Sequence, residues 1–383
     1  MRCQFIHSME SIDAERWNRV VGSDYPFLRH QFLSALEHSQ CIGDTRGWHS
    51  HHLLIFDDDQ LIALMPLYLK QHSYGEYVFD WSWAEAYQKY GLQYYPKLIA
   101  AIPFTPASGP RLCHTLNHPE EIHRLIHKVT AHLDSTCAER HYSGWHVLFP
   151  NADDSALWQQ THAAQRIACH FQWFNREYAS FDDFLATFSS RKRKNVRKER
   201  RRVVEQGLEV ERLTGDAITA EHWQQFYRCY QMTYAKRSGH GGYLTPEFFA
   251  CLQRDCQQQI LLVIATDGDT LVASALYFFD DTTLYGRYWG ALKDYDGLHF
   301  EACYYQGIEF CIEQGLQRFD PGVQGEHKIM RGFEPVITES YHQLKDPEFF
   351  GAIQHFVEEE ATMVKKYQAE ARQALPFKST STD

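Results

Sequence analysis

Hydrophobic and polar residues recur with two different periods along the chain, and the changes of period predict its elements. Aromatic and β-branched residues alternate over residues 282–289, which is typical of a strand. Residues 293–297 are turn formers, and apolar residues then recur at helical spacing over 300–312 until Gly315 ends the helix. A short strand and a charged loop, residues 324–332, complete a strand–loop–helix–strand unit.

The same patterns predict a mixture of strands and helices throughout the chain. An antiparallel meander is expected over 259–266, 270–279 and 282–289, and a strand pair over 48–69. The other predicted elements are strands over 4–7, 74–83, 145–149, 171–177, 208–213 and 340–344, and helices over 12–21, 27–38, 87–98, 119–141, 155–164, 181–206, 221–236, 246–256 and 347–375.

Two segments of the chain are similar to each other. Residues 53–69 read LLIFDDDQLIALMPLYL, and residues 261–278 read LLVIATDGDTLVASALYF. Both combine an apolar strand, an Asp-rich turn and a second apolar strand, so they predict a duplicated domain, although two hairpins can also agree by chance. We therefore expect an N-terminal domain over 1–178 and a C-terminal domain over 179–383, the latter with a basic helix at 190–206 and a closing helix at 347–375.

Composition and charge narrow the class of protein. The chain has 383 residues, of which 44% are hydrophobic, and a net charge of −11. Residues 191–202 contain nine basic residues and one acid, which leaves −19 for the rest of the chain. An acidic body argues against general coating of nucleic acid. No secretory signal or membrane-spanning run is visible, and ten scattered cysteines lack a Cys-x-x-Cys pair, so we expect a cytoplasmic protein with reduced thiols.

Several motifs resemble one bacterial family. They are residues 190–200 (SRKRKNVRKER), Leu298–His299–Phe300–Glu301 with Tyr304, Tyr305, Gly307 and Ile308, residues 324–328 (QGEHK) with Arg331–Gly332, and in the first half residues 65–70, 74–77, 80–81, Tyr87, 90–91 and Pro106 with 109–111. These motifs resemble the FemAB-like proteins, which are described as predicted N-acyltransferases of peptidoglycan biosynthesis or recognition. The resemblance extends over nearly the whole chain.

The resemblance implies a fold and an activity. The expected fold is α/β (α+β), with two GNAT-like subdomains that each contain a mixed, mainly antiparallel sheet flanked by helices. The expected activity is that of an N-acyltransferase moving an acyl or aminoacyl group from acyl-CoA or aminoacyl-tRNA to an amine, on a peptidoglycan precursor or a related small molecule. The alternative is a non-catalytic GNAT-fold protein that binds a peptidoglycan fragment.

One loop departs from the usual GNAT pattern. GNAT enzymes carry a glycine-rich pyrophosphate loop, whereas residues 294–299 of this chain contain one glycine and two acids, Asp294 and Asp296. Carboxylates repel a pyrophosphate, so this loop disfavours ordinary acetyl-CoA binding.

The charged loop supplies the main candidates for catalysis. Glu326 or His327 could take the proton of an attacking amine, and Lys328 and Arg331 could neutralise a phosphate or a carboxylate. Glu301 opens the preceding helix and is a further catalytic candidate. The alternatives are a surface loop of salt bridges and, for Glu301, a favourable interaction with the helix dipole.

The remaining candidates would bind the donor or the substrate. Backbone N–H groups near Trp289 could polarise the donor carbonyl, and one face of the basic helix could contact phosphates, unless that face is simply solvated. The predicted binding residues are Arg287, Trp289, Tyr295, His299, Gln324, Arg191, Lys194, Lys198, Asp80, Trp81 and Tyr90. No metal is expected, since His123 and His127 lack a third ligand.

Overall fold

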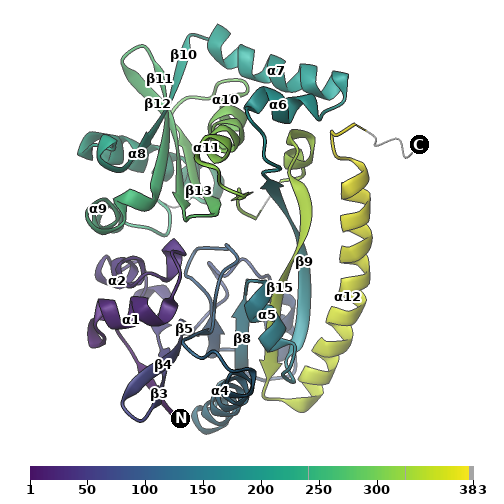
Figure 1. The fold of residues 1–383 in the computed structure, drawn as a ribbon. Coiled ribbons are helices and arrows are strands. Elements are labelled where there is room, and N and C mark those ends of the chain that lie inside the picture. The colour runs from purple at the N-terminus through teal and green to yellow at the C-terminus, as the bar shows by residue number, and fades with distance from the viewer. Residues whose placement is uncertain (240, 324, 379–383) are drawn as a thin grey trace. The chain divides into compact units, whose positions relative to one another are not determined.

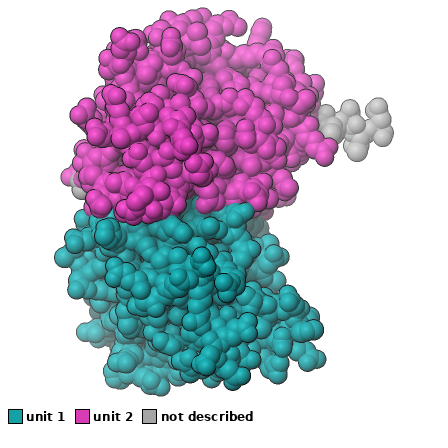
Figure 2. Space-filling view, turned by 60° about the vertical axis from the view of Figure 1, so that its left-hand side comes forward, with its two compact units in different colours: residues 1–168, 337–366 teal, residues 169–336, 367–383 magenta. Residues whose placement is uncertain are grey.

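The chain folds into two compact units, which Figure 2 distinguishes by colour. The computed structural model describes residues 1–239, 241–323 and 325–378. Unit 1 comprises residues 1–168 and 337–366, and unit 2 comprises residues 169–336 and 367–383. The sequence predicts one division after residue 178, whereas the compact units are discontinuous because the end of the chain returns to unit 1 before it rejoins unit 2.

Unit 1 contains two groups of strands with helices packed around them. One sheet has the order β1-β3-β4-β7, and a second run of strands has the order β15-β8-β6-β5-β2. The elements are β1 (Arg2–Ile6), α1 (Ala14–Val21), α2 (His30–His38), β2 (Trp48–Ser50), β3 (His52–Asp57), β4 (Gln60–Met65), β5 (Leu67–Lys70), α3 (Trp81–Lys89), β6 (Lys97–Ala100), β7 (Cys113–His114), α4 (Pro119–Arg140), β8 (Gly144–Leu148) and α5 (Ala152–Trp158). β9 (Ala164–Phe174), β15 (Glu334–Leu344) and α12 (Pro347–Gln373) each run across a unit boundary.

Unit 2 is built on strands in the order β10-β11-β12-β13-β14-β9. Its helices α8 and α9 cover one face of β11–β13, and α11 covers the other (Figure 1). The elements are α6 (Phe181–Ala186), α7 (Ser190–Glu205), β10 (Leu208–Thr214), α8 (Ala220–Ser238), α9 (Pro246–Asp255), β11 (Ile260–Asp267), β12 (Thr270–Phe279), β13 (Thr283–Ala291), α10 (Leu298–Phe300), the π-helix η6 (Glu301–Tyr305), α11 (Gln306–Gln314), β14 (Arg318–Asp320) and the 3₁₀ helix η7 (Glu326–Arg331). These mixed, mainly antiparallel sheets flanked by helices confirm the predicted fold class.

The two similar sequence segments form similar hairpins. β3 and β4 pair in antiparallel fashion, and their register shifts after the second residue pair from the turn, between Phe56 and Ile55. β11 and β12 pair in the same way, and their register shifts between Thr266 and Ala265, again after the second pair from the turn. A bulge at the same place in both hairpins supports the interpretation of a duplicated unit.

Two predicted elements in unit 1 are wrong. The expected strand over 74–83 is a turn that leads into α3, because Gly75 and Tyr77 have φ values of +81° and +61°. The expected helix over 87–98 ends early, since Gly91 has a φ of +74° and strand β6 begins at Lys97.

The predicted helix over 181–206 is two helices. Residues 187–189 interrupt it by pairing with the end of the chain: Ser189 N donates to Pro376 O, and Lys378 N donates to Thr187 O. The isolated bridge between Phe188 and Phe377 lies at this point. Residues 187–189 are thereby joined to residues 376–378, and α7 begins as a separate helix.

Each unit has its own hydrophobic core. In unit 2, Trp173, Phe184, Tyr277 and Phe319 form part of a cluster of buried residues between the sheet and helices α6, α7 and α11. All ten cysteines carry free thiols. Within the described residues, no helix combines the length and the apolar composition needed to cross a membrane.

Candidate active site

Strands β13 and β14 run together for only three residue pairs. Their parallel ladder joins Thr283 to Arg318 and ends with Tyr285 opposite Asp320. β13 continues to Ala291, so its second half, which includes Arg287 and Trp289, extends beyond the ladder with β14. The site is built around this half of β13 and the helical segment that follows it.

The helical segment after β13 contains one irregular turn. Gly297 caps α10 with a φ of +83°, and Gly315 ends α11 with a φ of +69°. Between them, η6 is a π-helix, a conformation that is frequent at functional sites. η6 carries Tyr304 and Tyr305, both buried, toward two different partners.

Tyr304 contacts His327, one of the predicted catalytic residues. The Tyr304 hydroxyl lies 2.8 Å from His327 Nε2. The imidazole also packs beside Phe300 and His299, with ring centroids 5.6 Å and 6.0 Å away. Partial burial lowers the pKa of His327, and the nearby cations Arg331 and Lys328 lower it further. The imidazole is therefore neutral at pH 7 and able to accept a proton.

Arg331 holds the loop that carries His327. Its Nη1 donates to the His327 carbonyl at 2.7 Å, and its Nη2 lies 2.9 Å from both carboxylate oxygens of Glu199. The guanidinium lies over the Phe300 ring, 3.3 Å from its centroid, and the side chain is buried. Tyr305 also donates its hydroxyl to Glu199. All these contacts favour a positioning role for Arg331.

Lys328 and Glu326 flank His327 but make different contacts. Lys328 is buried, and its Nζ donates to the Gly322 carbonyl at 2.6 Å. Burial lowers the pKa of Lys328 to about 8, although Asp320 opposes the shift. Glu326 is exposed and accepts a hydrogen bond of 2.8 Å from the Tyr367 hydroxyl. Gln324, predicted to bind the donor, lies outside the described residues.

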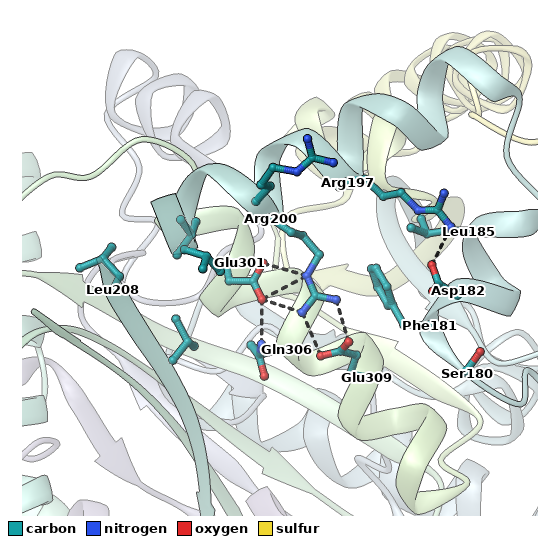
Figure 3. A pocket seen from close by; sticks show the side chains of 14 residues that line it. Ser180, Phe181, Asp182, Leu185, Arg197, Arg200, Leu208, Glu301, Gln306 and Glu309 are labelled. Atoms are coloured by element: carbon teal, nitrogen blue, oxygen red, sulfur yellow. Dashed lines mark hydrogen bonds and ion pairs between the residues drawn. The ribbon is translucent and has the colours of Figure 1, made fainter. Parts of the chain in front are cut away.

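Glu301, the third predicted catalytic residue, lies in a different cluster (Figure 3). Its buried carboxylate accepts from Arg200 Nη2 at 2.8 Å and from Gln306 Nε2 at 2.7 Å. Arg200 also donates to Glu309, from Nη1 at 2.7 Å and from Nη2 at 3.0 Å. A carboxylate held in this way already has its partners, so the geometry favours a role in anchoring α7 rather than in proton transfer.

Glu301 and Arg200 line a pocket of about 600 Å³ between α6, α7, β10 and the helical segment. Its other lining residues are apolar side chains of α6, α7 and β10 together with charged and polar ones, among them Asp182, Arg197 and Glu309. The three predicted catalytic residues therefore fall into two groups. Glu326 and His327 are adjacent, whereas Glu301 lies in the other cluster.

The acidic loop before α10 faces cations. Asp294 lies 3.5 Å from Lys236 Nζ, and Asp296 forms an ion pair with Arg202. Tyr295 donates its hydroxyl to Asp267. The two carboxylates predicted to repel a pyrophosphate are thus partly neutralised by α7 and α8.

The other predicted donor-binding residues of unit 2 are spread over two regions. The His299 ring lies 5.4 Å from the Trp289 ring, so these two residues come together. Arg287 is half-buried on β13, and its guanidinium lies 5.4 Å from the Tyr288 ring. Arg191, Lys194 and Lys198 are exposed on α7.

The predicted binding residues of unit 1 lie in two environments. Asp80 is buried, and its carboxylate accepts from Lys97 at 2.5 Å and from the Tyr94 hydroxyl at 2.6 Å. A carboxylate buried in this way is an internal ion partner, which is not the position expected of a residue that contacts a substrate. Trp81 packs edge-on to Tyr74, and Tyr90 is 73% exposed.

Sequence reasoning missed several residues that organise the site. Tyr304, Tyr305, Glu199 and Arg200 hold the two clusters together. Glu199 carried a usable signal, because it is the single acid among nine basic residues. Among the residues that the structure describes, no group of three or more His, Cys, Asp or Glu side chains is arranged to hold a metal ion.

Comparison with solved structures identifies proteins of similar fold. The C-terminal domain of a putative lysylphosphatidylglycerol synthetase from Agrobacterium fabrum has a TM-score of 0.53 at 10% identity, over 93% of this chain and 98% of that chain. FemX has a TM-score of 0.52 at 12% identity, over 92% and 100% of the two chains. A conserved protein of unknown function from Bacteroides thetaiotaomicron has a TM-score of 0.52 at 12% identity, over 89% and 99%.

Sequence comparison places the chain in a family. No curated protein matches it significantly. The family model FemAB-like, described as peptidoglycan biosynthesis/recognition, matches residues 8–379. This match covers nearly the whole chain, and the chain therefore belongs to the FemAB-like family.

Proposed function

We propose that the protein transfers an acyl or aminoacyl group from an activated donor to an amine on a peptidoglycan precursor or a related small molecule. The observation that carries the proposal is the contact between Tyr304 and His327, in which a neutral imidazole lies 2.8 Å from a buried hydroxyl. The family description and the FemX-like fold support it.

The chemistry is direct transfer without a covalent enzyme intermediate. The amine nitrogen attacks the donor carbonyl, the new carbon–nitrogen bond forms, and the carbon–oxygen or carbon–sulfur bond to the carrier breaks. His327 takes the amine proton, either directly or through the Tyr304 hydroxyl, and the leaving group or solvent then receives it. Arg331 and Glu199 keep His327 in place during this exchange.

The residues near the second half of β13 would bind the donor. Backbone N–H groups near Trp289 would polarise the donor carbonyl, and the Trp289 and His299 rings would contact the acyl group. Lys328, whose pKa is about 8, is mostly charged at pH 7 and would neutralise negative charge on the donor or acceptor.

Two donors remain to be distinguished, an acyl-CoA and an aminoacyl-tRNA. The partly neutralised acids Asp294 and Asp296 leave less repulsion toward a CoA pyrophosphate than the sequence alone predicts, but they add no attraction. A transfer assay with each labelled donor and a precursor peptide that carries a free amine would identify the donor.

The same assay tests the proposal with matched variants. His327→Ala should lower turnover at least about 100-fold, because it removes the proton acceptor. His355→Ala removes an exposed imidazole on α12 and should leave turnover unchanged. Absence of transfer from both donors, together with thermal stabilisation by a muropeptide alone, would instead favour a binding protein.

A further inference from the structure

One face of helix α7 carries basic side chains that the fold does not use. Arg191, Lys194, Lys198 and Arg201 follow one another at spacings of three and four residues and are all exposed. They form no ion pair within the described part of the chain. Together they make a basic face about 15 Å long, since each helical residue rises about 1.5 Å.

Other basic residues of the same helix have structural partners. Arg197 lies 2.8 Å from Asp182, Arg200 contacts Glu301 and Glu309, and Arg202 pairs with Asp296. Anchoring α7 therefore requires these three arginines and leaves the basic face available for another charge. The rest of the chain is strongly acidic, so this face is where the protein can approach an anionic surface.

Apolar side chains lie at both ends of the basic face. Val204, one turn after Arg201, is 70% exposed. Met330 is 37% exposed, and its sulfur lies 3.1 Å from Lys192 Nζ near the start of α7. Val204 is exposed and therefore has no role in the core. Met330 is a second exposed apolar side chain beside the same helix, so the basic face has an apolar residue at each end.

The pocket of Figure 3 opens beside this face. Arg201 and Val204 both line it, and apolar side chains of Leu185, Val203, Leu208 and Val210 form much of its wall. Its volume of about 600 Å³ is within the range of sites that hold small organic ligands. The pocket also contains the carboxylates of Asp182, Glu301 and Glu309, which are already paired with Arg197 and Arg200. An apolar wall next to exposed Arg201 suits an amphipathic anion, which carries a charged group and a hydrocarbon chain.

We propose that the basic face of α7 and the adjacent pocket bind the surface of an anionic phospholipid membrane. The four cations would contact lipid phosphates, while Val204, Met330 and the pocket wall would contact the acyl region of the lipid. This proposal is independent of the proposed transferase activity, because neither the basic face nor the lining of the pocket includes His327 or Tyr304.

RNA is the competing partner for a basic helix. Surfaces that bind single-stranded nucleic acid usually stack bases on exposed aromatic rings. In the described residues of unit 2, the exposed large hydrophobic side chains are Val204, Met232, Leu292 and Met330, none of which is aromatic. The exposed apolar side chains near the basic face are therefore aliphatic, as a lipid contact requires, and not the aromatic rings on which bases stack.

Vesicle sedimentation tests the proposal. The full chain is mixed with phosphatidylcholine vesicles with and without about one third phosphatidylglycerol, and binding to tRNA is measured in the same buffer. The variant Lys194→Glu/Lys198→Glu is compared with Arg124→Glu/Lys128→Glu, a matched pair of exposed cations four residues apart on α4. Val204→Asp tests the apolar contact.

We expect binding to the anionic vesicles only. The α7 double variant should lower this binding about 30-fold or more, and Val204→Asp about tenfold, while the α4 variant binds like the wild type. Unchanged thermal unfolding shows that the variants are folded. The proposal is overturned if the wild type does not bind anionic vesicles, if both double variants behave alike, or if the α7 variant loses tRNA binding alone.

Discussion

The carboxylate of Glu199 and the guanidinium of Arg331 form an ion pair between residues 132 positions apart, with Nη2 of Arg331 2.9 Å from both carboxylate oxygens. The same guanidinium donates to the His327 carbonyl at 2.7 Å. Helix α7 thus positions the short helix η7 that carries the proposed proton acceptor. A role of α7 in catalysis would be indirect, through this contact.

Glu199→Gln should destabilise the protein. The substitution removes the charge that balances buried Arg331, and Glu199 is itself partly exposed, so we expect a loss of about 1–3 kcal/mol in the free energy of unfolding. Glu205→Gln, on the exposed part of the same helix, should change it by less than about 0.5 kcal/mol. Urea denaturation measures both, and equal effects would argue against the ion pair as an anchor.

The variant Tyr304→Phe should show whether His327 or Glu326 is the proton acceptor. It removes the hydroxyl that contacts His327 Nε2, and we expect turnover to fall about 10- to 100-fold with the fold intact. Tyr367→Phe removes the corresponding hydroxyl from Glu326 and should change turnover little. If Tyr367→Phe lowered turnover and Tyr304→Phe did not, Glu326 would be the better candidate.

Acid should destabilise unit 1 through a buried pair of histidines. His146 Nδ1 lies 2.8 Å from His342 Nδ1, and burial lowers the pKa of both, that of His146 to about 3. The unfolded chain binds protons near pH 6.5 and the native pair does not, so stability falls as the pH falls below 6.5. The effect of one such group reaches about 3 kcal/mol by pH 4.5.

Denaturation at several pH values checks this expectation. The variant His146→Gln should lose less stability than the wild type between pH 7 and pH 4.5, whereas His123→Gln, an exposed control, should show the wild-type slope. A slope that is the same in all three proteins would contradict the assignment.

Gly290 should tolerate no side chain. A Cβ atom there would lie 1.9 Å from the Cys229 carbonyl oxygen of α8, a main-chain atom that cannot move aside. Gly290→Ala should therefore cost several kcal/mol or prevent folding. At Gly286, on the same strand, a Cβ atom would lie 3.3 Å from its nearest neighbour, so Gly286→Ala should cost much less stability. Thermal unfolding of both variants measures the difference.

Local patterns predicted most of the helices and strands of unit 2. The meander of β11, β12 and β13 and the helices α8 and α9 lie close to their predicted ranges, because each has a clear hydrophobic period and a turn or cap at its ends. Prediction failed where tertiary contacts decide the conformation. Residues 74–83 are aromatic like a strand, yet buried Lys97 draws Glu76 and Asp80 inward and the chain turns.

The candidate site was only partly predictable. The charged segment of residues 324–331 made His327 a candidate, but its partner Tyr304 has the helical spacing of a core residue and was not predicted as a site residue. Glu301 was indistinguishable in sequence from a catalytic acid, since only the fold brings Arg200, 101 positions away, against it.

The pH dependence of kcat/KM in the transfer assay tests the central claim most directly. His327 has a lowered pKa, so the loss of rate caused by protonation of the imidazole should appear only below about pH 6.5. His327→Ala should have a low rate without this acid limb. A variant that keeps the wild-type rate and the same acid limb would contradict the assignment of His327 as the proton acceptor.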